Sequence, residues 1–426
     1  MKIEISSDKV NPFSGINFVI EEIRNKGIDK LIDRELGERG KGSEYSYSDI
    51  FTIMWCILYC GGDCAEDIEI NLREHLSGIP NLLIPGADTV LRGQKELSTE
   101  KEFTISKSGI RHENNVNIEL NQLAVKIQKK LGLLKKNEKY TFDFDHQLLP
   151  CEKKDTKMSY KHEEGYFPGV CLINSMPVYI ENRSGNTNVK YLQEDTLQRA
   201  YTMLEEEGIQ IDCSRMDCGS YAKLIIDVIE KHSKYFYIRA QKCENMEEQI
   251  FQITDWKKVK INKKKYEVAS IEYFPFGQIE KGYRLVIMRE PNTTGEMNLF
   301  TRDAMIYRSI LTNDWKKSEK KIIEFYNARG SAEKVFDMMN NDFGWNKMPF
   351  SWMHENLVYL IITGMCRSLY KYMITKYSKK LKFIESNFRL KKFIFRFITV
   401  AGKWIRRGGQ DVLKLFTTKP YQLTLK

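Results

Sequence analysis

The sequence predicts an α/β protein in which a mixed sheet with helices on its faces is interrupted by a β-rich insertion and flanked by helical regions. Three observations predict this class. Residues 139–180 hold three short runs typical of strands, residues 189–239 alternate between helix and strand patterns, and residues 241–315 hold β-rich runs between Gly, Pro and Asn turns. The length of 426 residues, with 42% hydrophobic and 29% charged residues, indicates a large globular core and excludes disordered and collagen-like proteins.

Residues 1–137 are predicted to form a helical N-terminal region. Apolar residues recur at helix-compatible spacing from Phe18 to Ile32, and Leu120, Leu123, Ile127 and Leu131 follow at steps of three and four. Lysines between residues 129 and 139 indicate an exposed linker after this region.

Residues 138–240 and 316–345 are predicted to form one core. The predicted elements are strands at 139–145, 169–173 and 177–180, a helix at about 189–207, a strand that ends at Asp217, a helix at about 221–232, a strand at 235–239 and a long helix at about 314–341. Three strands in a meander, followed by helix, strand, helix and strand, fit a mixed sheet covered by helices. A ribonuclease H-like core has this order of elements.

Residues 241–315 are predicted to form a β-rich insertion domain, and residues 346–426 a basic helical C-terminal region. The insertion holds strand-like runs at 258–261, 266–271 and 284–288, and the C-terminal region begins with a helix at 352–376.

The net charge of +10 is concentrated at the C-terminus. From Arg367 onward, sixteen Lys and Arg residues stand against two acids, so the first 366 residues carry −4. Such asymmetry indicates contact with nucleic acid, while a membrane-surface helix is a weaker interpretation. No apolar run approaches the roughly 20 residues that cross a bilayer, and nine cysteines without a signal peptide indicate reduced thiols in the cytoplasm.

Cys56, Cys60 and Cys64 recur at a spacing of four residues, which places them on one face of a helix. The pattern permits a metal site, but no histidine or CxxC pair lies nearby, so the favoured interpretation is small apolar residues in a core.

Three acidic residues lie where a ribonuclease H-like fold would bring them together. Asp145 ends the first strand, with Asp143 on the same face, Asp217 ends the fourth strand, and Glu333 follows the insertion. Carboxylate oxygens are hard ligands, and three such groups hold two Mg²⁺ ions in phosphoryl-transfer sites. The choice between Asp143 and Asp145 as the first ligand stays open at this point.

The helix that carries Glu333 also carries Tyr326 and Arg329. Spacings of three and four residues predict that all three lie on one face. This arrangement is either a surface Arg–Glu pair beside a packed Tyr, or a phenol and a guanidinium that flank a metal-binding carboxylate. Arginine is well shaped for bidentate phosphate contacts.

These residues resemble insertion-sequence transposases of the Asp-Asp-Glu type, in the IS-four-like branch with the signature Y-x2-R-x3-E-x6-K. Here the signature reads YNARGSAEKVFDMMN, while FDFDHQ, RSGNTN and RMDCGSY are similar to the other motifs of the family. The closest resemblance is to the IS-thirteen-eighty-like group and spans residues 86 to about 370. The chain departs from the pattern at Asn340, where the family has Lys, and at His146-Gln147, where Ser-Thr is common.

The resemblance implies a cut-and-paste transposase that cleaves element ends and joins the 3′-hydroxyl to target DNA. Asp145, or alternatively Asp143, would act with Asp217 and Glu333 as catalytic ligands of two Mg²⁺ ions, with Mn²⁺ as a substitute. The partners would be double-stranded transposon-end and target DNA, bound by a homodimer at synapsis in a bacterial cytoplasm. The predicted DNA-contacting residues are Tyr326, Arg329, Lys334, Lys391, Lys392, Arg406 and Arg407.

The sequence also leaves alternatives for the function, for the DNA-reading region and for an aromatic residue that stacks on a flipped base. A metal-dependent nuclease or resolvase on the same fold, and a DNA-binding derivative without catalysis, are the alternative functions. The N-terminal region is a second candidate for reading element ends. If excision passes through a DNA hairpin, a flipped base would stack on an aromatic residue, with Trp256, Trp315 and Trp345 as candidates.

Overall fold

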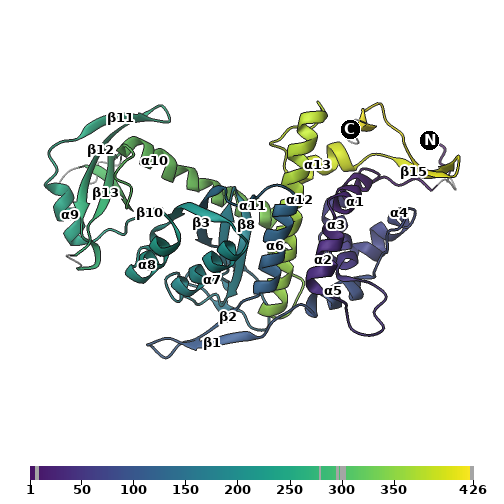
Figure 1. The fold of residues 1–426 in the computed structure, drawn as a ribbon, viewed down its shortest axis with the longest axis horizontal. Coiled ribbons are helices and arrows are strands. Elements are labelled where there is room, and N and C mark those ends of the chain that lie inside the picture. The colour runs from purple at the N-terminus through teal and green to yellow at the C-terminus, as the bar shows by residue number, and fades with distance from the viewer. Residues whose placement is uncertain (5–8, 278–279, 294–296, 298–303, 423–426) are drawn as a thin grey trace.

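A mixed sheet of 11 strands runs along the long axis of the molecule, and a cluster of helices lies at one end of it (Figure 1). The computed structural model describes residues 1–426 except 5–8, 278–279, 294–296, 298–303 and 423–426. The strands follow one another across the sheet in the order β1-β2-β8-β7-β3-β9-β10-β14-β13-β12-β11.

The described strands fall into this sheet, a small three-stranded sheet and a terminal hairpin. In chain order they are β1 (Lys101–Ile105), β2 (Arg111–Asn115), β3 (Lys139–His146), β4 (Leu149–Pro150), β5 (Lys157–Met158), β6 (Glu164–Tyr166), β7 (Gly169–Ile173), β8 (Met176–Arg183), β9 (Gln210–Met216), β10 (Tyr235–Arg239), β11 (Lys257–Ile261), β12 (Lys264–Tyr273), β13 (Tyr283–Pro291), β14 (Met305–Thr312), β15 (Gly402–Arg407) and β16 (Gln410–Leu415).

The described helices flank the sheet and form the helical end of the molecule. They are α1 (Ile16–Asn25), α2 (Ile28–Leu36), α3 (Tyr47–Cys60), α4 (Arg73–Leu76), α5 (Ala87–Lys95), α6 (Ile118–Lys130), α7 (Gln193–Glu206), α8 (Lys223–His232), α9 (Glu244–Phe251), α10 (Glu319–Asn327), α11 (Ser331–Asp342), α12 (Met353–Lys380) and α13 (Leu390–Phe393), with short 3₁₀ or π turns at η1 (Ile68–Leu72), η2 (Cys218–Ser220), η3 (Pro275–Gly277), η4 (Ala328–Gly330), η5 (Trp345–Lys347) and η6 (Ile394–Ile398).

The centre of the sheet has the predicted ribonuclease H-like topology. The first strand of the core, β3, pairs antiparallel with β7, which pairs antiparallel with β8, and β3 pairs parallel with β9, which pairs parallel with β10. By order of appearance these strands lie 3-2-1-4-5 across the sheet, so the predicted fold class is confirmed.

The insertion extends this sheet. Strands β11–β14 form at the predicted β-rich positions, and β14 pairs antiparallel with β10 of the core. Helix α10 packs Ile322 and Ile323 against the inserted strands through residues such as Val286 and Ile310. The inserted residues therefore share the core's sheet instead of forming a sheet of their own.

Two layers of helices enclose the central strands. Helices α7 and α8 pack on the face that carries Phe142 and Phe144. The opposite face, which carries Val170 and Leu172, packs against α11 and the buried length of α12. Helix α12 also joins the sheet to the N-terminal helices, because the Trp55 indole donates to the Ile362 carbonyl at 3.1 Å.

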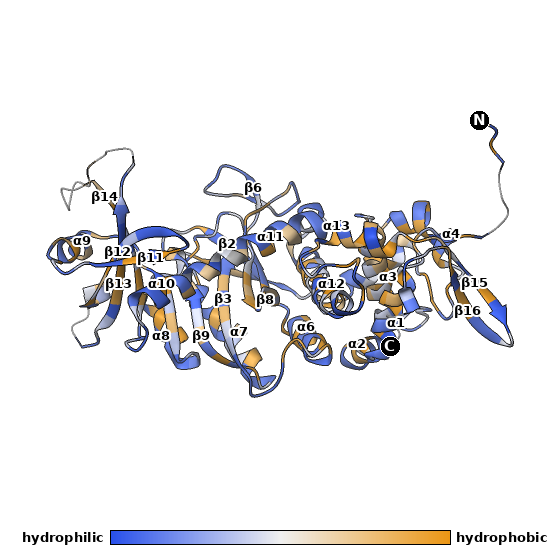
Figure 2. Ribbon diagram, turned by 90° about the horizontal axis from the view of Figure 1, so that it is seen from above, coloured by the Kyte–Doolittle hydropathy of each residue, from blue (hydrophilic) through white to orange (hydrophobic). Residues whose placement is uncertain are grey.

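Two regions that were predicted to be helical contain hairpins. Strands β1 and β2 form a hairpin around a turn with Gly109 at φ +78°. Strand β2 also pairs with β8, which joins this hairpin to the main sheet. At the C-terminus, β15 and β16 flank Gly408 and Gly409, both at positive φ (Figure 2). Paired glycines between β-branched and aromatic runs are a hairpin signal, so residues 402–415 depart from the helical character predicted for residues 346–426.

The predictions for the cysteines and for α12 are largely confirmed. Cys56 and Cys60 are buried in the core, where burial raises the pKa of the Cys56 thiol to about 12, whereas Cys64 is exposed beyond the end of α3. The helix predicted at 352–376 is α12. None of the described helices is long and apolar enough to cross a membrane.

Candidate active site

Asp143 and Asp145 lie on the same face of β3, opposite the face of Phe142 and Phe144. Because side chains alternate along a strand, both carboxylates lie on the side of α10 and α11. Asp145 is level with Val170 of β7, whose side chain packs with residues of α11 and α12.

Asp143 is held in a buried ion pair. Its register partner on β9 is Arg215, and the Arg215 guanidinium donates to both Asp143 oxygens at 2.7 Å. The same guanidinium donates to the Phe325 carbonyl at 2.7 Å, which ties β9 to α10. Both carboxylate oxygens of Asp143 are thus occupied by an internal partner. Bidentate Arg–carboxylate pairs of this kind are strong and geometrically specific.

Asp145 and Asp217 lie at the carboxyl ends of neighbouring parallel strands. Phe144 is in register with Met216, so the next residues along the two strands are these two aspartates. The Asp217 carboxylate accepts a hydrogen bond from the Gly219 amide at 3.0 Å. Burial raises the pKa of Asp145 to about 6, opposed by Arg329 and reinforced by the charge of Asp217.

Arg329 contacts the Asp145 carboxylate at 2.9 Å and donates to the Phe144 carbonyl at 3.4 Å. Its Nε is buried without a hydrogen-bond partner among the described residues. Tyr326, one turn earlier, donates its hydroxyl to the Met216 carbonyl at 3.1 Å, directly before Asp217. Burial raises the pKa of Tyr326 to about 12, so the phenol is a hydrogen-bond donor at neutral pH.

The predicted continuous helix from 314 to 341 is interrupted. The 3₁₀ turn η4 separates α10 from α11, so Tyr326 and Glu333 do not share one continuous helical face. Glu333 lies exposed in the first turn of α11 and has no hydrogen-bond or ion-pair partner among the described residues. The carboxylates of Asp145, Asp217 and Glu333 do not gather within 4.8 Å of one another in the described part of the chain.

A second buried pair lies beside the site. Arg183, from the RSGNTN segment, donates to Nε2 of His146 at 2.9 Å, and the imidazole stacks on Phe167 at 5.0 Å. Burial, with the charge of Arg183, holds the pKa of His146 well below its usual value, so this imidazole is a neutral acceptor. Burial also lowers the pKa of Arg183 to about 10.

Sequence reasoning missed the roles of Arg215 and Arg183. A signal for Arg215 exists, because Asp143-x-Asp145 on one strand and Arg215-x-Asp217 on the next have the same spacing. When Asp145 on one strand is aligned with Asp217 on the neighbouring parallel strand, Asp143 falls opposite Arg215. The position of Arg183 offers no comparable signal, since its partner comes from a strand two places across the sheet.

The predicted cationic DNA contacts lie on the surface. Lys334, Lys391, Lys392, Arg406 and Arg407 are exposed, and none pairs with a carboxylate among the described residues. Two of the interleaved aromatics pack inward, as Phe393 stacks on Phe397 at 4.9 Å, whereas Phe395 is 66% exposed. Among the candidates for base stacking, Trp345 is fully buried, which contradicts its proposed availability, whereas Trp315 is 53% exposed.

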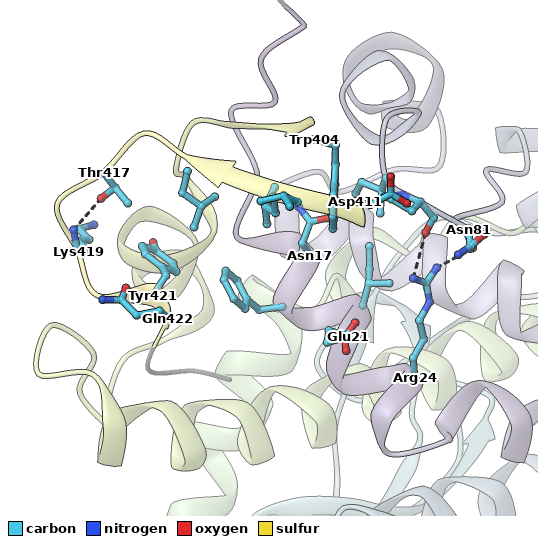
Figure 3. Close-up of a pocket in the computed structure, with 17 residues that line it drawn as sticks. Asn17, Glu21, Arg24, Asn81, Trp404, Asp411, Thr417, Lys419, Tyr421 and Gln422 are labelled. Atoms are coloured by element: carbon cyan, nitrogen blue, oxygen red, sulfur yellow. Dashed lines mark hydrogen bonds between the residues drawn. The ribbon is translucent and has the colours of Figure 1, made fainter. Parts of the chain in front are cut away.

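One cavity lies away from Asp145 and Asp217. It has a volume of about 720 Å³ between α1 and β16, and Trp404, Tyr421 and Arg24 are among its lining residues (Figure 3).

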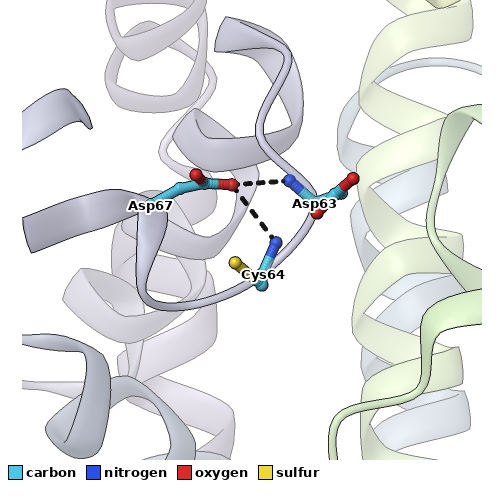
Figure 4. A group of neighbouring side chains, drawn as sticks. All are labelled: Asp63, Cys64 and Asp67. Carbon is cyan, nitrogen blue, oxygen red and sulfur yellow. Dashed lines mark hydrogen bonds between the residues drawn. The ribbon is translucent and has the colours of Figure 1, made fainter. Parts of the chain in front are cut away.

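Asp63, Cys64 and Asp67 lie close together after α3, where the Asp67 carboxylate accepts hydrogen bonds from the Asp63 and Cys64 amides at 2.9 and 3.4 Å (Figure 4). These amide contacts make Asp67 a cap of the loop.

A ribonuclease H-like sheet with aspartates at the ends of its first and fourth core strands defines a nucleic-acid phosphoryl-transfer enzyme. Residues 18–426 match the family model described as transposase DDE domain group 1, and the chain belongs to this family. It is therefore a DDE transposase, a metal-dependent enzyme of DNA cleavage and strand transfer. None of the curated proteins is significantly similar to it.

Two solved structures are similar in part. The piggyBac transposase, in a synaptic complex with hairpin DNA, is 11% identical at a TM-score of 0.41, with 91% of this chain and 80% of that chain covered. The Drosophila P element transposase, in a strand transfer complex, is 14% identical at a TM-score of 0.25, with 58% of this chain and 52% of that chain covered. Family membership rests on the family model, which spans all but the first 17 residues.

Proposed function

We propose that this transposase uses Asp145, Asp217 and Glu333 as ligands of two Mg²⁺ ions, with Mn²⁺ as a substitute. The observation that carries the assignment is the parallel register of β3 and β9, which sets Asp145 beside Asp217 while Arg215 occupies Asp143. The proposal therefore takes Asp145 as the first ligand. It also assigns the chain to the IS-four-like branch, nearest the IS-thirteen-eighty-like group.

The donor set fits a hard divalent cation. Two carboxylates lie side by side, Asp145 has a cationic guanidinium against it, and Glu333 has no internal partner among the described residues. Oxygen donors are those that Mg²⁺ prefers. When bound, a pair of such ions activates the attacking hydroxyl and stabilises the leaving oxygen.

The surrounding residues hold and orient the ligands. Tyr326 fixes the main chain directly before Asp217, and the Asp143–Arg215 pair locks β3 to β9 and α10. Arg329 neutralises Asp145 in this arrangement, and a planar guanidinium also suits a DNA phosphate. Arg329 would exchange the Asp145 carboxylate for a phosphate oxygen when the substrate and metal arrive.

The proposed substrate is double-stranded DNA, first an element end and then target DNA. The exposed cations that we assign to backbone contacts are Lys334, Lys391, Lys392, Arg406 and Arg407. Lysine and arginine on such surfaces bind phosphates with a strong salt dependence. We further propose that residues 1–137 read the element end and that two copies of the chain synapse two ends.

The test is end cleavage by Asp217→Asn with Mg²⁺, against Asp212→Asn as the matched control. Asp212 lies on the same strand, where its carboxylate is 3.7 Å from Lys139 at the surface. We expect Asp217→Asn to lose cleavage while the control keeps it. Cleavage by Asp217→Asn at the wild-type rate would refute the assignment of Asp217 as a metal ligand.

A second arm separates a transposase from a nuclease on the same fold. Pre-cleaved ends are supplied with a supercoiled plasmid target, and joined products are counted. The same site performs both displacements, because each is an in-line attack at phosphorus. We expect joined products from the wild type, and cleavage without any joining would favour the nuclease.

A further inference from the structure

The hairpin formed by β11 and β12 carries a dense cluster of lysines. Six lysines lie between residues 257 and 265, and all are exposed: Lys257, Lys258, Lys260, Lys263, Lys264 and Lys265. The hairpin lies at the far end of the sheet from the basic C-terminal region (Figure 1). The net charge of −4 on the first 366 residues therefore conceals a second, local basic surface.

Two of these lysines have carboxylate partners on the same side of the hairpin. Lys257 lies 3.6 Å from Glu319, and Lys264 pairs with Glu290. Lys258 is in register with Glu267, but Arg289 already holds that carboxylate at 2.8 Å. The remaining cations, Lys260, Lys263 and Lys265, have no acidic partner among the described residues.

The register places two of the unpaired lysines directly opposite each other. Lys260 of β11 is the pairing partner of Lys265 of β12, so both side chains lie on one face, together with Lys258. Like charges at opposed positions of an antiparallel pair destabilise the pair. An anionic partner on this face would remove that repulsion.

Protection of a sheet edge explains only part of the pattern. Lysines on an edge strand such as β11 discourage pairing with other chains. Lys265 lies on β12 instead of the edge strand β11, and Lys263 lies in the turn, so protection of the β11 edge does not account for either residue. A membrane surface is also less favoured, because the unpaired face offers charge without exposed large apolar residues.

We propose that Lys258, Lys260, Lys263 and Lys265 form a second DNA-backbone contact, separate from the basic C-terminal region. The inference rests on the proposed function, since DNA is the polyanion that the enzyme handles. Lysine ammonium groups on a strand pair bind phosphates as point charges without reading sequence. DNA bound at Asp145 and Asp217 would then be contacted by the insertion (residues 241–315) as well as by the basic C-terminal region.

The experiment compares two double variants that remove the same charge from the same hairpin. Lys260→Gln/Lys265→Gln removes the opposed, unpaired lysines, and Lys257→Gln/Lys264→Gln removes the two that have partners. Binding to duplex DNA is followed by fluorescence anisotropy across a salt series, and thermal unfolding is measured alongside. We expect the first variant to reduce the slope of log Kd against log salt by about 1.8, from about 0.9 per phosphate contact.

Stability should change in the opposite direction to binding. Removing opposed like charges should keep or raise the Tm of the first variant, whereas the control loses ion pairs and should keep the wild-type salt slope with an equal or lower Tm. Weaker DNA binding by a protein that is no less stable would be the signature of a contact surface.

Four results would overturn the proposal. They are an unchanged salt slope in the first variant, equal slope losses in both variants, self-association of the first variant with wild-type DNA binding, and loss of binding to phosphatidylserine vesicles without loss of DNA binding. None of these measurements uses cleavage. A failure of the Asp217→Asn test would therefore be distinguishable from a failure at this hairpin.

Discussion

The sheet side and the helix side of the candidate site differ in how firmly their acids are held. On the sheet side, Asp145 and Asp217 are set side by side by strand register, and Arg329 contacts the former at 2.9 Å. On the helix side, Glu333 lies exposed, directly after a 3₁₀ interruption, with no partner among the described residues. Two of the proposed ligands are positioned by strand register, and the position of the third depends on a three-residue junction.

This difference indicates how the site assembles. Preorganised carboxylates repel each other, and burial adds to the cost of their charges. If Glu333 is the third ligand, its exposed position keeps a third negative charge away from the two aspartates in the metal-free protein. Substitutions on the sheet side and on the helix side should therefore affect stability and cleavage differently.

The largest effect is expected for Asp145→Asn. The substitution keeps the shape of the side chain and removes a ligand charge, so cleavage with Mg²⁺ should fall about 1,000-fold, equivalent to about 4 kcal/mol. Single-turnover cleavage of an end duplex measures this loss. If Asp145→Asn cleaves normally, and Asp143→Asn remains folded but does not cleave, the first-ligand assignment is reversed.

Glu333→Gln should cost nearly as much activity, at least about 100-fold in single-turnover cleavage, by the same loss of a metal ligand. Its Tm should stay at the wild-type value, because the exposed carboxylate has no partner to lose among the residues that the structure describes. Glu324→Gln, at an exposed position of α10, is the control and should keep both activity and Tm. A clear drop in the Tm of Glu333→Gln would show that Glu333 is already held in the fold.

Asp143→Asn should act on stability. The Arg215 guanidinium would remain buried without its counter-charge, so the free energy of unfolding should fall by about 3–5 kcal/mol. Denaturant unfolding measures the loss. The double variant Asp143→Leu/Arg215→Met should recover much of it, because replacing both partners leaves no unpaired charge. A single variant as stable as the wild type would contradict a structural role for the pair.

The sequence patterns predicted the central elements of the fold well because each element carries its own signal. Alternation in Lys139–Asp145 and the apolar run of Gly169–Ile173 reflect burial on defined faces, and both form strands. The order of Asp145, Asp217 and Glu333 along these elements was likewise visible. The motif residues thus indicated the chemistry before any geometry was known.

What the patterns missed depends on contacts between distant segments. The break at η4 lies in a stretch of helix-compatible spacing, where Gly330 is the weakest helix former between Tyr326 and Val335. The hairpin at 402–415 lies inside a basic region predicted to be helical, and Gly408-Gly409 signals its turn. The ion pair of Asp143 and Arg215 requires the strand register, which spacing alone does not fix.

The smallest expected effect, and the sharpest test of the helix side, is Gly330→Ala. Gly330 has a φ of −55° and a ψ of −8°, and an added Cβ would meet no atom within 4 Å, so alanine fits without strain. Because alanine leaves the unfolded chain less conformational freedom than glycine, the variant should raise the free energy of unfolding by about 0.4–1 kcal/mol and stiffen the junction. If Glu333 must move to complete the site, cleavage should fall a few-fold while metal-free DNA binding stays constant. Equal or faster cleavage by the more stable variant would show that the junction is not a moving part, and that α11 already holds Glu333 where the chemistry needs it.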